Sequence, residues 1–409
     1  MRAWHKSIIS YFAFAGFAWA SWVVRLPEIK TLIGVNTSQL GLVLLAGSIG
    51  SLIALVLSNR FIERFGTKKS LLGGYGLFTA SIAAAAFSAS LHSAIFVAVF
   101  AFLVGFGVGF ADVAQNVDGS QIEQQMGKSL MPRLHAAYSL GTLAGAGYGS
   151  LGSWLHLTIQ WQTWVMVPIF AALVFFTVRH LPVDTGKILS ASRVANSHDS
   201  NAASETATVP DAKPSSRKSA LSLLFSSSLF LIGLGIFAIT LVEGASNDWL
   251  ALSIVENYSA TPANAGIGYA FLVGAMTITR FFGGNLVDVW GRDVVLRRAA
   301  LVGVVGIVVL IFAPAWFGSS ALYVAWIASG LWGVGVALAF PLFLSAAGEG
   351  DESARRVALV ATCGYTAFLV GPPLLGFLGQ SIGLLNMFFV LAACLVLAAF
   401  IAGALKPSS

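Results

Sequence analysis

The sequence is dominated by long apolar runs that are separated by short polar loops. A helix needs about 20 apolar residues to cross the hydrocarbon core of a bilayer, so each run has the length of a transmembrane helix. The runs lack the alternation of apolar and polar residues that is typical of a transmembrane β-barrel. Twelve spans are expected, at approximately 7–27, 38–58, 70–91, 93–115, 134–156, 160–181, 221–249, 264–285, 294–314, 319–345, 355–378 and 383–405.

The composition agrees with a membrane protein. Only 10% of the 409 residues are charged and 57% are apolar, whereas a soluble domain has about 25% charged residues. The net charge of +6 does not indicate nucleic-acid binding, because the Lys and Arg residues lie in short loops and form no basic stripe. Cys363 and Cys394 both lie inside apolar runs, so neither a disulfide framework nor a CxxC metal site is expected.

The basic residues predict the orientation of the chain, because Lys and Arg are enriched in cytoplasmic loops. With twelve spans, every Lys and Arg except Arg25 and Lys30 falls on the side that holds both termini, with Arg280 counted at a helix end. We therefore expect a multi-pass protein with both termini in the cytoplasm, which for a bacterial chain means the cytoplasmic (inner) membrane.

A polar segment divides the chain. Residues 182–220 are rich in Ser, Ala, Asn, Asp and Lys, a composition that cannot bury enough apolar surface to order itself. The sequence predicts an N-terminal six-helix bundle at 1–181, a flexible cytoplasmic linker at 182–220 and a C-terminal six-helix bundle at 221–409. A regulatory or partner-binding role is the alternative for the linker.

The loop after the second run of each half carries a similar pattern of a carboxylate, a glycine and basic residues, at 59–69 and at 284–292. Both loops resemble the signature of the major facilitator superfamily, although Asn59 and Glu63 stand where that signature has Gly and Asp. The resemblance covers essentially the whole chain. It implies an all-α integral membrane protein with twelve transmembrane helices in two pseudo-symmetric six-helix bundles.

Shorter stretches resemble the bacterial MosC/YbjJ-like group of that superfamily. They are 112–117, 134–141, 243–245, 364–365 and 371–373. The group is loosely linked to sugar-derived compounds such as rhizopines, so this finer resemblance says little about the substrate itself.

The resemblance also implies that the two signature loops gate transport. Glu63 and Asp288 are expected to lie against the positive N-terminal end of a helix from the other half. The expected helices start after Ser353 and near Pro132, respectively. A loop that only sets topology is the alternative. The predicted gating residues are Glu63, Arg64, Gly66, Asp288, Gly291 and Arg292.

Ionisable residues inside apolar runs are costly and usually functional. Glu243 lies well inside the seventh run, with Asn247 one helical turn away on the same face. It is the first candidate for binding substrate and for carrying a proton, and a structural pairing with an Arg is the alternative. Asp248 is expected near the outer end of this helix, solvated or facing Arg25.

Asp112 is the second candidate for proton coupling. It lies toward the cytoplasmic end of the fourth helix, with Gln115 and Asn116 on the same face. A structural pairing with Arg133 or Arg280 is the alternative.

Aromatic residues complete the expected site. Trp19 and Trp22 share a face of the first helix, and Tyr138 and Tyr365 lie at related places in the fifth and eleventh helices. Stacking against a sugar or planar ring is one interpretation, and packing or an interfacial belt is the other. The predicted substrate-binding residues are Trp19, Trp22, Gln115, Asn116, Tyr138, Glu243, Asn247 and Tyr365.

These features predict a secondary active transporter that moves a small polar organic solute, such as a sugar-like compound, by proton-coupled alternating access. The expected partners are the solute, protons and the lipid bilayer, with no cofactor, no metal, no nucleic acid and a monomeric state. An efflux pump of the same fold is an alternative. A passive channel is disfavoured by the lack of a filter-like loop, and an enzyme by the lack of GxSxG, Walker and metal-ligand motifs.

Overall fold

The structure is a computed structural model that describes residues 2–126, 130–183, 185–186, 227–349 and 353–405. All regular elements in these ranges are helices. In the N-terminal half they are α1 (Arg2–Val23), α2 (Leu26–Ile33), α3 (Thr37–Phe65), α4 (Thr67–Ser90), α5 (Ala94–Met126), α6 (Met131–Trp154), α7 (Ile159–Trp164), α8 (Met166–Thr177) and η1 (Val178–His180). Most of the predicted linker at 182–220 lies outside the described residues.

The C-terminal half has the same kind of architecture. Its helices are α11 (Ser227–Asn257), α12 (Pro262–Trp290), α13 (Arg292–Phe317), η2 (Gly318–Ser320), α14 (Ala321–Val336), α15 (Ala339–Ala347), α16 (Ser353–Ile382), α17 (Leu384–Ile401) and η3 (Ala402–Leu405).

The prediction of twelve transmembrane helices is confirmed. Among the described residues, nine stretches are long and apolar enough to cross a membrane, and α1 with α2 makes a tenth across a bend of 46°. The stretch Arg292–Ala347 contains two spans, because α13 and α14 pack against each other. The remaining span is α6, whose 24 residues include many Gly, Ser and Tyr that lower its hydropathy.

Helices of the N-terminal half approach one another closely at glycines. A Cβ atom on Gly141 of α6 would lie 2.0 Å from the carbonyl oxygen of Ala13 in α1. A Cβ atom on Gly105 of α5 would lie 1.9 Å from the carbonyl oxygen of Gly47 in α3. Lipid gives no hydrophobic drive between helices, so close van der Waals packing of small residues holds them together. This packing accounts for part of the high glycine content.

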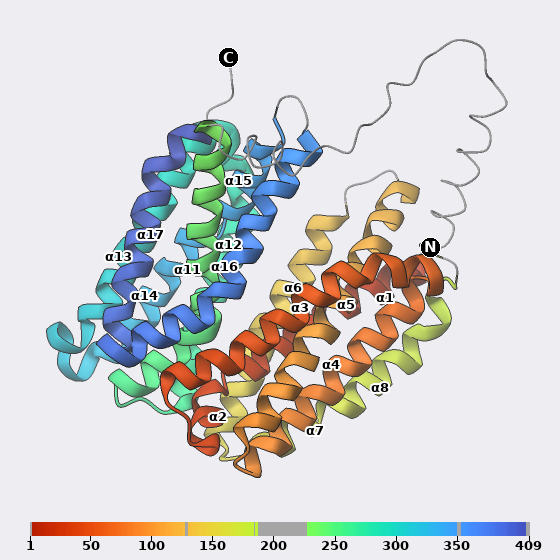
Figure 1. Ribbon diagram of the computed structural model, residues 1–409, viewed down its shortest axis with the longest axis horizontal. Helices are drawn as coiled ribbons and strands as arrows, with labels where there is room; N and C mark the ends of the chain where they lie inside the picture. The colour runs from red at the N-terminus through yellow and green to blue at the C-terminus, as the bar shows by residue number, and fades with distance from the viewer. Residues whose placement is uncertain (1, 127–129, 184, 187–226, 350–352, 406–409) are drawn as a thin grey trace.

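The two halves form separate bundles that meet at one end of the molecule. One buried cluster contains only residues of the N-terminal half. The other contains the C-terminal half together with Ala20, Val23, Val24, Leu40 and Ala146. Figure 1 shows that the bundles meet near α2 and diverge toward the opposite end. We call the end near α2 the far end, and the end at which α1 begins the termini end.

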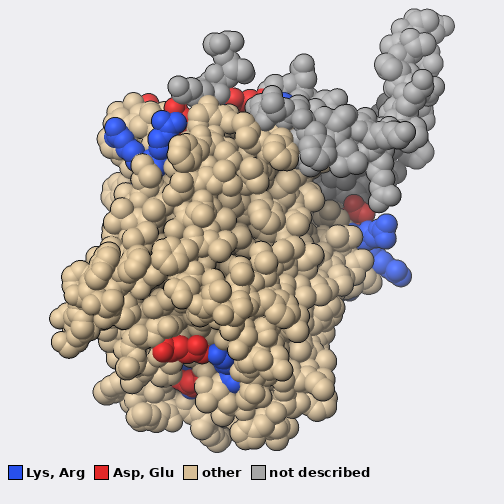
Figure 2. Space-filling view, turned by 60° about the vertical axis from the view of Figure 1, so that its left-hand side comes forward, with Lys and Arg blue, Asp and Glu red and all other residues tan. Residues whose placement is uncertain are grey.

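The surface of the bundles suits a lipid environment. Figure 2 shows a broad uncharged belt between charged side chains near the upper edge and a small charged group near the lower edge. Large apolar side chains such as Val56, Ile95, Phe175 and Phe281 are exposed. A soluble protein rarely exposes so much contiguous apolar surface, so these faces contact the hydrocarbon core.

Candidate functional site

The two bundles are closed against each other at the far end. Helix α3 packs against α16, and α6 packs against α12. The backbone N–H of Thr37 donates to Oε1 of Gln380 at 2.9 Å. Lys30 of α2 forms an ion pair with Glu256 near the end of α11. These contacts join the two halves at the far end, and the polar groups described next lie between this end and the termini end.

One face of α5 carries the polar residues Asp112, Gln115 and Asn116. The buried Gln115 donates from its amide to Oδ1 of Asp112 at 2.8 Å and accepts a hydrogen bond of 2.6 Å from the hydroxyl of Tyr75 in α4. Asn116 donates to the backbone oxygen of Asp112 at 2.8 Å. The side chain of Asp112 is exposed and lines a hollow on this face together with Asn116 and Ser120.

The C-terminal half contributes an ion pair and a hydrogen-bonded amide. Nη2 of Arg280 in α12 lies 3.0 Å from Oε1 of Glu243 in α11. Nε of Arg280 donates to the carbonyl oxygen of Ala337 at 3.0 Å, which fixes the guanidinium. Tyr269 of α12 donates its hydroxyl to Oδ1 of Asn247 at 2.6 Å.

These groups of the two halves converge around Tyr138 of α6. Its phenol is close enough to Asp112, Arg280 and Glu243 to interact with all three charges. His135, one turn earlier on α6, interacts with Asp112 and Arg280 in the same way. The region between the bundles therefore brings together carboxylates, a guanidinium, an imidazole and phenols from α5, α6, α11 and α12.

Tyr365 of α16 extends this region, because it also interacts with Asp112. Trp19 is half-buried and packs against the buried clusters of both halves. Trp22 is buried in the cluster of the N-terminal half, which is the packing role that the sequence left open for it.

The signature loops lie at the termini end, away from this region. Gly66 and Gly291 have φ angles of 83° and 81°, values that L-residues with a side chain rarely adopt. Each glycine ends one helix and starts the next. Within the described ranges, the exposed carboxylates of Glu63 and Asp288 have no hydrogen-bond or ion-pair partner.

Two basic residues of these loops contact groups of their own half. Arg64 lies over the ring of Phe65, 5.3 Å from its centroid. Arg292 pairs with Glu349 at the other end of the α13–α15 segment. The six predicted gating residues therefore lie at two tight turns, and a contact of either carboxylate with the opposite bundle stays a prediction.

The structure corrects the position of Arg280. Counted at a helix end from the sequence, it lies ten residues before the end of α12, because that helix continues to Trp290. It therefore belongs to the span and neutralises Glu243. Asp112 is bound by Gln115 and not by Arg133 or Arg280. Likewise, the buried Arg25 binds groups of its own half, namely Glu28, Gln162 and the carbonyl oxygen of Leu157, and not Asp248.

Sequence reasoning missed Tyr75 and Tyr269 as parts of this region. Both are buried aromatic residues in apolar runs, and such residues usually pack in a core. The one available signal is the phenol itself, because a buried hydroxyl needs a hydrogen-bond partner.

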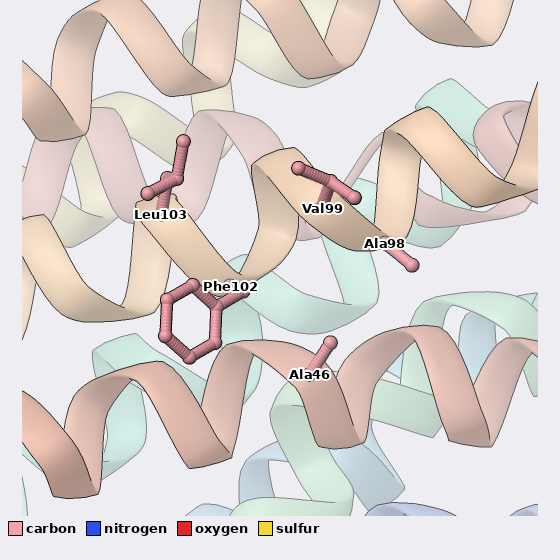
Figure 3. Close-up of a pocket in the computed structure, with 5 residues that line it drawn as sticks. All are labelled: Ala46, Ala98, Val99, Phe102 and Leu103. Carbon is pink, nitrogen blue, oxygen red and sulfur yellow. The ribbon is translucent and has the colours of Figure 1, made fainter.

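Two further kinds of site give no additional candidate among the described residues. No group of three or more His, Cys, Asp or Glu side chains in the described part of the chain lies close enough together to hold a metal ion. A hollow between α3 and α5 is lined by Ala46, Ala98, Val99, Phe102 and Leu103 (Figure 3). Its lining is wholly apolar, so it offers no group that binds a polar solute.

Comparisons with known proteins agree on one family. The model of the Major Facilitator Superfamily matches residues 7–350. An uncharacterised MFS-type transporter of Yersinia pestis is 27% identical over 377 residues, covering 90% of this chain and 87% of the relative. The membrane protein MosC of Rhizobium meliloti is 24% identical over 387 residues, covering 94% of this chain and 86% of the relative.

Solved structures share the fold. The nucleoside transporter NupG aligns with a TM-score of 0.70 at 14% identity and covers 99% of this chain and 100% of its own. A D-xylose-proton symporter aligns with a TM-score of 0.70 at 16% identity and covers 97% of this chain and 96% of its own. With its twelve membrane spans and a family match over most of its length, the chain belongs to the major facilitator superfamily and is a membrane transporter rather than an enzyme.

Proposed function

We propose that this protein is a secondary active transporter that moves a small polar organic solute across the bacterial cytoplasmic membrane by proton-coupled alternating access. The observation that carries the proposal is the convergence on Tyr138 of charged groups from both halves. A site shared by two bundles is loaded and emptied when the bundles rock about it.

The closed far end supports the alternating mechanism. Contacts between halves gather there, in α3 with α16 and in Lys30 with Glu256, while the bundles diverge toward the termini end (Figure 1). We assign the termini end to the cytoplasm, because nearly all basic residues belong to that side. The conformation is then inward-open, and the moving bodies are 1–181 and 221–409, joined by the linker at 182–220.

The polar chemistry of the region supports a small solute with several hydroxyl groups. The carboxylate of Asp112 and the amides of Asn116 and Asn247 can accept or donate hydrogen bonds, and Tyr138 and Tyr365 offer aromatic faces. Glu243 is neutralised by Arg280, so the site does not demand a strongly charged solute. The nucleoside transporter and the D-xylose-proton symporter make uridine and D-xylose the first solutes to test.

The test is transport by purified protein in proteoliposomes. Uptake of radiolabelled uridine and D-xylose is measured as exchange, with solute on both sides, and as accumulation driven by a pH gradient. We expect one of these solutes, or a related polyol, to be exchanged and, with the gradient, accumulated.

Site variants then locate the solute. We expect Tyr138→Phe to weaken exchange, because charged groups of both bundles converge on Tyr138. Tyr323→Phe is the matched control, since Tyr323 is 62% exposed on α14. Equal loss in both variants, or no loss in either, contradicts the proposed site.

A further inference from the structure

Helix α11 carries two carboxylates within its membrane-spanning part, Glu243 and Asp248. The helix continues nine residues beyond Asp248 to Asn257, which is about 14 Å at 1.5 Å per residue. The 31 residues of the helix span about 46 Å, so about 8 Å projects beyond each face of a hydrocarbon core of roughly 30 Å when the helix is centred in it. Asp248 is therefore inside the span, and not at the solvated outer end that the sequence suggested.

The two carboxylates differ in how their charge is compensated. Glu243 forms its ion pair with Arg280 at 3.0 Å. Asp248 is half-buried, and among the described residues no side chain or backbone group gives it a hydrogen bond or an ion pair. Its neighbours one turn away on α11 are Gly244, Ala245, Ala251 and Leu252, none of which has a side-chain donor.

The cations on α2, α12 and α16, which pack against α11, are engaged elsewhere, and the exposed Lys6 lies at the start of α1, at the termini end. The pairs are Arg280 with Glu243, Lys30 with Glu256, Arg25 with Glu28, and Arg356 with the carbonyl oxygen of Ala347, and Arg355 also has a partner. Among the described titratable groups, Tyr269 of α12 interacts with Asp248. Its hydroxyl proton is already donated to Asn247, so it does not compensate a negative charge on Asp248.

An uncompensated carboxylate at membrane depth is stabilised by binding a proton, whereas a carboxylate in an ion pair has no such need. We propose that Asp248 is the group that binds and releases the transported proton, while Glu243 with Arg280 serves the solute. The proton adds to one carboxylate oxygen from water and returns to water on the other side of the membrane. This assignment rests on the proposed proton coupling, and it moves that role from Glu243 and Asp112 to Asp248.

Asp248 lies between the polar region around Tyr138 and the contacts of the far end, because α11 runs from Glu243 through Asp248 to Glu256. Opening of the far end would bring outside water to Asp248, and closing it would leave access from the cavity. A proton carrier needs this alternating access to water from the two sides. Glu256 does not meet that requirement, because its side chain is 37% exposed and reaches water in this conformation.

Infrared spectroscopy of the reconstituted protein tests protonation without a known substrate. A protonated carboxyl group has a C=O stretch that a carboxylate lacks, so a pH titration reports each group that gains a proton. We expect Asp248→Asn to remove one titrating carboxyl band that Glu243→Gln retains. Asp118→Asn, at a buried carboxylate that Thr67 binds at 2.7 Å, is the matched control and should leave that band in place. Loss of the band in Glu243→Gln alone, or its persistence in Asp248→Asn, overturns the assignment.

Transport separates this assignment from the function on which it rests. For a solute that the wild type accumulates, we expect Asp248→Asn to lose pH-driven accumulation at least tenfold and to retain exchange, since the amide keeps the shape of the carboxyl. Glu243→Gln should lose both modes. Accumulation that survives in Asp248→Asn overturns the role of Asp248 alone. A wild type whose transport ignores the pH gradient overturns proton coupling itself.

Discussion

Asp112 shows how individual residues of the proposed solute site are held in one orientation. Tyr75 donates to Gln115, and Gln115 donates to Asp112, so a phenol in the bundle core orients a carboxylate that is exposed between the bundles. A carboxylate held in one orientation loses less conformational entropy when a solute binds. Asn247 is held in the same manner by Tyr269, so each half has one amide that is oriented by a buried tyrosine.

Removal of this support should weaken solute binding. Tyr75→Phe deletes the hydroxyl and leaves the Oε1 atom of Gln115 without its donor. Such a loss costs about 0.5–1.5 kcal/mol, which is about a two- to tenfold rise in the KM for exchange. Tyr11→Phe is the control, because Tyr11 stacks on Tyr75 but donates or accepts its hydrogen bond with Thr177. An unchanged KM in Tyr75→Phe, with normal folding, contradicts the positioning role.

The sequence singled out Asp112 and Glu243 as candidates because an isolated charge in an apolar run has few structural explanations, and their roles stay predictions. It misplaced Arg280, since a boundary error of a few residues decides whether an Arg counts as a loop residue or as part of a span. Tyr75 and Tyr269 were not predictable, because the partner of a buried hydroxyl depends on which helices become neighbours.

At the scale of whole elements, neighbouring helices approach most closely where one of them has a glycine at the contact. Gly141 and Gly147 both lie in α6. A Cβ atom on Gly141 would meet the backbone of α1, whereas a Cβ atom on Gly147 would have no atom of a neighbouring helix within 4 Å among the described residues. The helices themselves were predictable from the apolar runs. These contacts were not, because one sequence does not reveal which face of a lipid-embedded helix meets a neighbour.

Substitution of these glycines should separate packing from helix propensity. Gly141→Leu forces α1 and α6 apart, and overpacking of this kind costs about 1–3 kcal/mol. We expect a lower midpoint of thermal unfolding in detergent for Gly141→Leu and little change for Gly147→Leu. Equal midpoints for both variants would show that α1 and α6 are not packed as described.

The turn between α12 and α13 should control the rate of transport and not solute affinity. Gly291 has φ and ψ angles of 81° and 157°, a backbone conformation that is essentially restricted to glycine and costs a residue with a Cβ atom about 1–3 kcal/mol. We expect Gly291→Leu to lower the exchange rate while the Kd of the solute changes less than twofold. Gly284→Leu, in the last turns of α12 with open space around it, is the control. A large loss of affinity in Gly291→Leu would contradict a gating role.

At the scale of the molecule, orientation can be tested by labelling. The background replaces Cys363 and Cys394, the two cysteines of the chain, by Ser. A membrane-impermeant thiol reagent added to whole cells should label Ser259→Cys, which lies between α11 and α12, and should miss Arg64→Cys at the end of α3. Both positions are exposed, so the reverse pattern would place the termini end outside the cell.

The ion pair between Lys30 and Glu256 should bias the conformational equilibrium only slightly. Both residues retain some solvent exposure, and such pairs contribute about 0.2–1 kcal/mol. Lys30→Met should therefore raise the population open at the far end by up to about fivefold. The population is measured with spin labels at Thr31 and Asn257, exposed neighbours that leave the pair intact. A population closed at the far end that is unchanged or higher in Lys30→Met would show that the ion pair does not stabilise the closed state.

The most direct test of alternating access measures both ends of the molecule in the same preparation. Spin labels at Thr31 and Asn257 report the far end, and labels at Arg133 of α6 and Asp288 of α12 report the termini end, all at exposed positions. Pulsed electron–electron distances are recorded in liposomes across a range of pH and with a transported solute. The account predicts that conditions which lengthen the far-end distance shorten the termini-end distance, with two discrete populations at each end. Distances that change together, or a far end that never opens, would contradict it.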